Sequence, residues 1–128
     1  MSGRVALDTN VVIRYFKGEP SVVARFKNVF PCLPLPVVGE LMFAVENSQH
    51  KLTNLHKLKG FLEACEVLPM GVSSAQQYAG VRMDLKRRGQ PIPENDVWIA
   101  ASCLEHKLPL ATYDGHFEVV EDLKILKW

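Results

Sequence analysis

The stretch that decides the expected fold runs from Arg4 to Ile13 and reads RVALDTNVVI. Its first part, Arg4–Leu7, is short and apolar, which predicts a buried strand. Asp8, Thr9 and Asn10 follow, and all three residue types favour the N-terminus of a helix. The next segment, Val11–Lys17, is expected to be that helix. A strand that passes directly into a helix indicates an α/β protein.

The rest of the chain continues this alternation of strand and helix signals. Further strands are expected at Cys32–Leu35, Cys65–Pro69, Pro109–Thr112 and Leu123–Leu126. Further helices are expected from Ser21 to about Phe30, from Pro36 to about Asn47, across Leu52–Leu62, from a cap at Ser73 or Ser74 to about Gly89, and over Asp96–His106 after a cap at Asn95. The pattern predicts a mostly parallel sheet with helices on both faces. Without repeats or linkers, residues 1–128 are expected to form a single domain.

Four acidic residues lie at the ends of apolar runs or inside them, at Asp8, Glu40, Asp96 and Asp114. Carboxylates are rarely left in apolar surroundings unless something pairs with them. No Lys or Arg lies in the segments that surround these acids, which are Val5–Asn10, Val37–Phe43, Asn95–Ala101 and Leu108–Asp114. A divalent cation is therefore the simplest partner, since such ions prefer hard oxygen ligands. In open α/β sheets functional groups gather at the carboxyl ends of the strands. The four acids are therefore expected to meet at one edge of the sheet.

Each acid also has an ordinary structural explanation when it is taken alone. Asp8 suits a helix cap, Asp96 suits the positive end of a helix dipole, and Asp114 with Gly115 suits a turn. Glu40 is harder to explain, because its helix neighbours are mostly apolar. The joint pattern on an alternating chain is what favours a shared site.

Bulk composition limits the class of protein. The chain has 128 residues, 48% of them hydrophobic and 23% charged, which is typical of a globular protein. A formal net charge of +1 argues against a protein dedicated to coating polyanions, although acids at a site can offset basic residues elsewhere. Three scattered cysteines without a C-x-x-C pair favour reduced thiols over disulfides or a zinc site. No apolar run reaches the ~18 residues of a membrane span and no signal-peptide pattern is present, so we expect a cytoplasmic protein without membrane contact.

The acidic motifs and their order resemble a known family. The motifs are Leu7-Asp8-Thr9-Asn10, Glu40-Leu41, Asn95-Asp96 with Ile99-Ala100-Ala101, and Thr112-Tyr113-Asp114-Gly115-His116-Phe117. They resemble the PIN-domain nucleases, and more closely the VapC-type toxins of prokaryotic toxin–antitoxin modules. The resemblance implies a three-layer α/β/α sandwich that cuts RNA with Mg²⁺ or Mn²⁺ and is held inactive by a cognate antitoxin. It also implies a homodimer, which the apolar residues of Leu52–Leu62 support.

The resemblance assigns roles to individual side chains. Asp8, Glu40, Asp96 and Asp114 fall at the four acidic positions of the family, and Asn10 and Thr112 fall at its polar supporting positions. From the chemistry of phosphodiester hydrolysis, we expect Asp8 and Asp96 to be the most direct metal ligands, with Asp114 completing the site. Glu40 would bind a second ion or orient the attacking water.

Basic residues near these acids are candidates for the RNA backbone. Lys86, Arg87 and Arg88 precede Asp96, and Arg14 and Lys17 follow Asp8, so all five are predicted to contact phosphates without reading sequence. The alternative for Lys86–Arg88 is a solvated helix end favoured by the dipole. Two other residues are expected to be ordinary: His116 as a packing or hydrogen-bonding residue, and Glu94 as a solvated loop residue.

Three alternative functions compete with a toxin nuclease. A phosphatase of the haloacid-dehalogenase type needs a second Asp two residues after the first, but that position is Asn10. A non-catalytic PIN-like binding module would be marked by loss of one or more acids, and none is lost. A PIN-fold nuclease of RNA processing remains open, because only the genomic neighbourhood would separate it from a toxin.

Overall fold

The computed structural model describes residues 3–128, and it contains one parallel sheet with helices on both faces. The strands are β1 (Gly3–Leu7), β2 (Val29–Pro34), β3 (Glu66–Leu68), β4 (Leu110–Ala111) and β5 (Ile125–Leu126). The helices are α1 (Thr9–Phe16), α2 (Pro20–Phe26), α3 (Leu35–Glu46), α4 (Lys51–Glu63), α5 (Val72–Arg87), α6 (Glu94–His106) and the 3₁₀ helix η1 (Gly115–Val119). The predicted α/β/α sandwich with a parallel sheet is confirmed.

The order of the strands reverses at the centre of the sheet. The order is β3-β2-β1-β4-β5, so the chain first builds outward from β1 on one side and then returns to its other side. All pairs are parallel, and Leu7 of β1 lies opposite Ala111 of β4. The connections that leave β1 and β4 turn away in opposite directions. Such a switch point is where open α/β sheets bind ligands.

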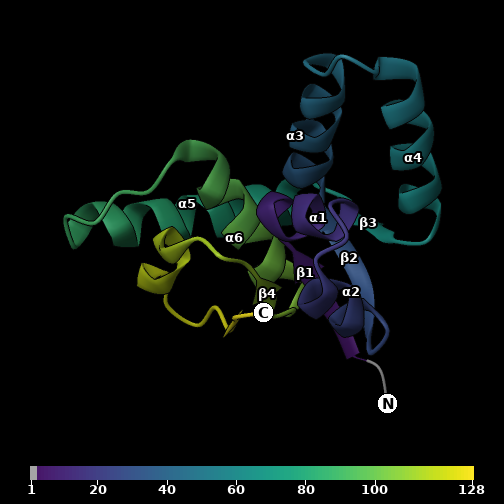
Figure 1. Ribbon diagram of the computed structural model, residues 1–128. Helices are drawn as coiled ribbons and strands as arrows, with labels where there is room; N and C mark the ends of the chain where they lie inside the picture. Colours follow the sequence, from purple (N-terminus) through teal and green to yellow (C-terminus); the bar gives the residue numbers. More distant parts are fainter. Residues whose placement is uncertain (1–2) are drawn as a thin grey trace.

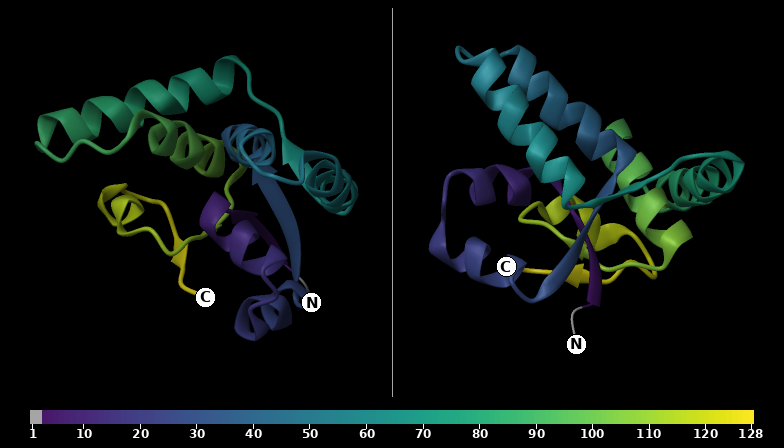
Figure 2. Two further views of the ribbon diagram at one scale, coloured as in Figure 1. Left: turned by 45° about the horizontal axis from the view of Figure 1, so that its top comes forward. Right: turned by 90° about the vertical axis from the view of Figure 1, so that its right-hand side faces the viewer.

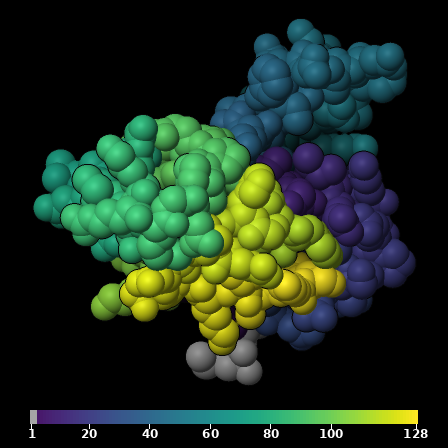
Figure 3. Space-filling model, turned by 90° about the vertical axis from the view of Figure 1, so that its left-hand side faces the viewer, coloured from purple at the N-terminus to yellow at the C-terminus, as the bar shows by residue number. Residues whose placement is uncertain are grey.

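The helices form two layers and one projection (Figure 1). Both panels of Figure 2 place α1 and α2 on one side of the sheet and α5 and α6 on the other. Helices α3 and α4 pack side by side and extend beyond the sheet, and Figure 3 shows this helical hairpin standing clear of the rest of the molecule. No helix within residues 3–128 is long and apolar enough to cross a membrane.

Helix α6 is apolar because much of it is buried in the core. Ala6 and Leu7 of β1 and Leu110 of β4 are fully buried, as expected for central parallel strands covered on both faces. The segment Ile99–Cys103 of α6 is buried along its whole length. Because α6 is anchored this firmly, the residues of its first turn have fixed positions beside the sheet.

Two helix starts differ from the sequence prediction. Asn95 is not the cap of α6, because the Pro93 carbonyl accepts the hydrogen bonds of Asp96 and Val97 and so starts the helix earlier. Neither Ser73 nor Ser74 is the cap of α5. The N-cap is Gly71, whose carbonyl accepts a hydrogen bond from the Ala75 N–H, while its own N–H donates to Ser74 Oγ at 3.0 Å.

The predicted boundary between the second helix and the second strand was also wrong. Helix α2 ends at Phe26, not near Phe30, and β2 begins at Val29 rather than Cys32. The reason is strand pairing, because Val29 lies opposite Gly3 and the two strands stay in register through Cys32. The backbone bonds gained along β1 outweigh the weak helix propensity of this segment.

Candidate active site

Asp8 is the buried centre of the site. It follows β1, caps α1 and is only 5% exposed. Its Oδ1 accepts a hydrogen bond from the Thr9 N–H at 2.8 Å, and its Oδ2 accepts one from Thr112 Oγ1 at 2.7 Å. The helix-cap explanation of Asp8 is therefore correct for one oxygen, while the other oxygen contacts the residue that follows β4.

Thr112 connects Asp8 to the loop that carries Asp114. Its hydroxyl donates to Asp8 and accepts a hydrogen bond from the Asp114 N–H at 2.9 Å. Asp114 in turn caps η1, where its Oδ1 accepts from the His116 N–H at 2.9 Å. These bonds fix the end of β4 against the end of β1, which brings two acids from opposite ends of the sequence together.

Asp96, Asp114 and His116 form the tightest cluster of ligand-type atoms. His116 Nδ1 lies 3.1 Å from Asp96 Oδ2 and 3.1 Å from Asp114 Oδ1. One ligand atom from each of the three residues lies within 4.8 Å of the others. Sequence reasoning treated His116 as a packing or hydrogen-bonding residue; the hydrogen bond is confirmed, but its place between two acids was missed. Its position two residues after Asp114 was the available signal.

Glu40 is linked to the start of α1 by Thr9, a residue that the sequence analysis considered only for its preference for helix N-termini. Thr9 Oγ1 donates a hydrogen bond to Glu40 Oε1 at 2.7 Å, which ties the start of α1 to α3. Thr9 lies between Asp8 and Asn10 in a sequence typical of a helix N-terminus. A contact with Glu40 could therefore not be recognised from the sequence. This contact places the fourth acid on the same edge of the sheet as Asp8.

The electrostatics of the site favour protonated or cation-bound carboxylates. Burial raises the pKa of Asp8 to about 6, and the charges of Asp96 and Glu40 act in the same direction, while hydrogen bonds from Thr112 and Thr9 oppose the rise. Burial also raises the pKa of Asp96, against the opposing contact with His116. Within residues 3–128, no Lys or Arg lies within 4.0 Å of the carboxylate oxygens of these four acids. The basic side chain that does contact them is the imidazole of His116, which lies 3.1 Å from an oxygen of Asp96 and 3.1 Å from an oxygen of Asp114.

Comparison with known proteins identifies the family. The PIN domain family model matches residues 5–123. The chain belongs to the PIN domain family. Ribonuclease VapC2 of Haemophilus influenzae is 29% identical over 126 residues, covering 95% of this chain and 96% of the relative. The tRNA(fMet)-specific endonuclease VapC of Shigella flexneri is also 29% identical over 126 residues, with the same coverage.

Solved structures agree with this assignment. The structure of VapBC2 from Rickettsia felis bound to a promoter DNA fragment superposes with a TM-score of 0.91 at 25% identity, covering 98% of both chains. DNA-bound VapBC from Salmonella typhimurium gives a TM-score of 0.89 at 27% identity, covering 100% of this chain and 99% of that chain. The likeness thus includes the whole PIN domain and its projecting helices.

Asn10 and Arg14, which follow Asp8 in this PIN domain, contact other residues of the chain. Asn10 Oδ1 accepts a hydrogen bond from the Tyr113 N–H at 3.4 Å, which helps to hold the loop after β4. The Arg14 guanidinium lies 3.8 Å from the centre of the Tyr113 ring and 3.7 Å from Glu19. Lys17 is exposed at the end of α1. Both basic side chains lie on the helix that Asp8 caps.

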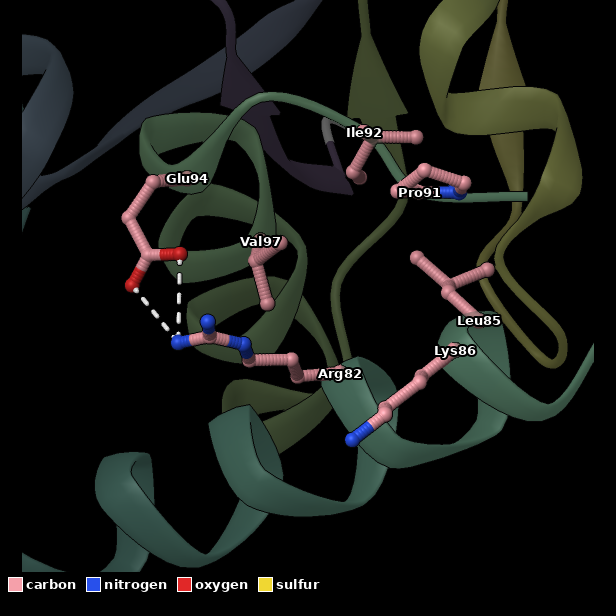
Figure 4. Close-up of a pocket in the computed structure, with 7 residues that line it drawn as sticks. All are labelled: Arg82, Leu85, Lys86, Pro91, Ile92, Glu94 and Val97. Atoms are coloured by element: carbon pink, nitrogen blue, oxygen red, sulfur yellow. Dashed lines mark hydrogen bonds and ion pairs between the residues drawn. The ribbon is translucent and has the colours of Figure 1, made fainter. Parts of the chain in front are cut away.

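The basic residues at the end of α5 differ in their contacts. Arg88 is held by Asp84 at 2.7 Å, by Gln90 at 2.8 Å and by the carbonyl of Val119. Lys86 instead lines a pocket of about 400 Å³ between α5 and the start of α6 (Figure 4). Arg87 is exposed on the last turn of α5. Arg88 is therefore engaged by its own chain, and all three residues remain predicted phosphate contacts.

Glu94 is exposed, as expected, but it lies on a helix and not in a loop. It begins α6 and accepts hydrogen bonds from Tyr78 and Arg82 of α5. Figure 4 shows the Arg82 guanidinium pointing toward the Glu94 carboxylate among the residues that line the pocket. The helix begins two residues earlier than predicted, because the Pro93 carbonyl accepts its first hydrogen bonds, and Glu94 therefore lies on α6.

Proposed function

We propose that this PIN domain is a divalent-metal-dependent endoribonuclease that hydrolyses RNA phosphodiester bonds. The observation that carries the proposal is a buried carboxylate, Asp8, linked through Thr112 to a second acid, with no Lys or Arg of residues 3–128 paired to either. The relatives named ribonuclease and tRNA(fMet)-specific endonuclease support RNA as the substrate.

The donor set fits Mg²⁺ or Mn²⁺. Asp8, Asp96 and Asp114 would hold the ion, with Glu40 beside a second ion or the attacking water, because carboxylate oxygens are the ligands these ions prefer. When bound, such an ion supplies charge stabilisation on the phosphoryl oxygens and a more acidic water. The imidazole of His116 would also suit Mn²⁺, since nitrogen ligands favour transition metals.

The chain's own groups would position the reacting parts. Thr112 and the Thr9 N–H hold Asp8 in one orientation, so its carboxylate needs no rearrangement on binding. The Thr9 hydroxyl holds one oxygen of Glu40, which leaves the other to orient a water molecule. His116 fixes Asp96 relative to Asp114 through the hydrogen bond at Nδ1. Asn10 supports the same loop through Tyr113.

A chelation experiment tests the proposal. Purified protein should cleave single-stranded RNA in Mg²⁺ or Mn²⁺, lose cleavage in EDTA, and recover it when excess divalent ion is returned. The reason is that the clustered acids repel RNA phosphates unless a cation neutralises them. Gel analysis of end-labelled RNA is the measurement, with Ca²⁺ as a control ion. Cleavage that is unchanged by EDTA would contradict the mechanism.

We further propose that the chain is the toxin of a toxin–antitoxin pair and self-associates. The VapBC complexes from Rickettsia felis and Salmonella typhimurium support this, and so does Leu52 on α4, an apolar side chain that is 86% exposed. Growth arrest on expression, relieved by the product of an adjacent small gene, would support it. A PIN nuclease of RNA processing is the alternative, and harmless overexpression would favour that reading. Sedimentation at high concentration tests the dimer.

The predicted RNA contacts have their own test. Replacing Lys86 and Arg87 with alanine should weaken RNA binding and make its salt dependence shallower, because fewer counterions are released. Arg14 and Lys17 are the next candidates if the slope does not change. The measurement is a salt titration of RNA affinity on an Asp96→Asn background, where cleavage cannot interfere.

A further inference from the structure

A groove along α3 opens directly onto the proposed active site. Its volume is about 520 Å³, within the range of pockets that hold small ligands. Its lining includes Thr9 and Glu40, which are the hydrogen-bonded pair of the site. Ile13, Pro36, Gly39 and Phe43 also line the groove. A ligand part lying in this groove would therefore be directly adjacent to a group held by the carboxylates.

Phe43 offers a ring that its own chain does not cover. It follows Glu40 by three residues, so the two side chains lie on the same side of α3 about one turn apart. Its side chain is 71% exposed, and no other aromatic ring of residues 3–128 packs against it. An exposed aromatic ring beside a nucleic-acid site is suited to stacking on a base.

Gly39 is the lining residue of the groove that has no side chain. A glycine inside a helix costs about 1 kcal/mol relative to alanine. The protein's own packing does not require it, because a Cβ at position 39 would meet nothing within 4 Å among the described residues, and its backbone angle φ is not positive. The space above Gly39 is thus free for a ligand, and a larger side chain would fill it.

The charges decide which part of a nucleotide the groove suits. Helix α3 contains neither Lys nor Arg, and Glu40 is its only charge before Glu46. A phosphate would find no positive partner on these walls, whereas an uncharged base would find an aromatic ring and an apolar floor. The phosphate next to that base would then lie at the carboxylates with their cation. Charge and shape therefore both place the base, not the backbone, in the groove.

We propose that the α3 groove binds a base of single-stranded RNA beside the scissile phosphate. The base stacks on Phe43, and the absence of a side chain at Gly39 leaves space for it. This inference rests on the proposed nuclease function. It assigns Phe43 a positioning role for the substrate and predicts that part of the RNA affinity depends on the bases themselves.

The test compares RNA oligonucleotides with and without bases. On an Asp96→Asn background, an intact single-stranded RNA and an abasic oligonucleotide of the same length are titrated by fluorescence anisotropy. Phe43→Ala should weaken binding of the intact RNA about tenfold and leave binding of the abasic chain unchanged, while Phe43→Tyr keeps the parental affinity. Phe30→Ala is the matched control, because Phe30 is 45% exposed but lies near the opposite end of β2 from α3.

A second pair of variants tests whether RNA binding needs the space at Gly39. Gly39→Leu should weaken binding of the intact RNA, although leucine favours helix and raises the midpoint of thermal unfolding. Gly60→Leu is its control, since Gly60 lies on α4, is also exposed and also has no neighbour within 4 Å of an added Cβ. Gly60→Leu should raise the midpoint without changing RNA affinity.

The outcomes separate this inference from the function on which it rests. If the parent chain shows no EDTA-sensitive cleavage, the nuclease proposal fails. If the parent cleaves RNA but Phe43→Ala binds intact and abasic RNA as the parent does, only the groove assignment is overturned. If Phe43→Ala changes the sedimentation coefficient and leaves RNA binding intact, the groove is a contact between copies of the chain, which also overturns the assignment.

Discussion

Replacing Asp96 with asparagine is expected to lower the rate of RNA cleavage at least about 100-fold. Asp96 lies beside Asp114 and His116, so the substitution removes a charged ligand from the tightest cluster of the site. Asp8→Asn should have an effect of similar size, because Asp8 is the buried acid between β1 and β4. The measurement is the single-turnover rate at saturating Mg²⁺ with circular dichroism to verify the fold.

Asp84→Asn supplies the control for these variants. Asp84 is an exposed acid on α5 that pairs with Arg88 and has no contact with the site. Its replacement should leave cleavage unchanged. A near-parental rate for Asp96→Asn or Asp8→Asn would remove that residue from the proposed set of ligands.

The metal-free protein is expected to lose stability as the pH rises from about 4 to about 6. The pKa of Asp8 is raised from its ordinary value of 3.8 to about 6 in the folded state, so the folded state binds more protons than the unfolded state in this interval. The contribution of protonated Asp8 to the free energy of unfolding is therefore complete below pH 3.8, and it is lost as the pH rises through 6. The loss is about 3 kcal/mol at most, and the raised pKa of Asp96 adds in the same direction.

Urea unfolding in EDTA across this pH range measures the effect. Asp8→Asn should flatten the pH profile, because an amide cannot ionise, even though the variant gives up one hydrogen bond worth about 1 kcal/mol. Added Mg²⁺ should restore stability to the parent at pH 7 but much less to the variant. A parental profile that rises between pH 4 and 6 would show that Asp8 is not destabilised by its surroundings.

The positions of the acids were predictable because they depend on the strands. Asp8 follows an apolar run that could only be a buried strand, and the rule for open α/β sheets then places it at the same edge as Asp114. Thr112 and Asn10, assigned from the family pattern, do make contacts at this edge. Local sequence and topology are sufficient for these features.

Other features depend on how separate elements pack, and no local pattern encodes that. The hydrogen bond between Thr9 and Glu40 requires the start of α1 to meet α3, and the contact of His116 with Asp96 requires η1 to meet α6. The helix caps were predicted from side-chain types, yet Gly71 and Pro93 start their helices through their carbonyls. Likewise, the contact of Arg88 with the carbonyl of Val119 requires the end of α5 to meet η1.

The bond between Asp8 and Thr112 has a consequence for the newly made chain. The two residues are 104 positions apart, so Asp8 leaves the ribosome long before its partner is synthesised. At typical elongation rates of about 5–20 residues per second, the interval is roughly 5–20 s. For much of this interval the nascent polypeptide contains Asp8 and Glu40, while Asp96 and Asp114 have not yet been synthesised. The four carboxylates can come together only near the end of translation, which delays any harm from the chain until it is nearly complete.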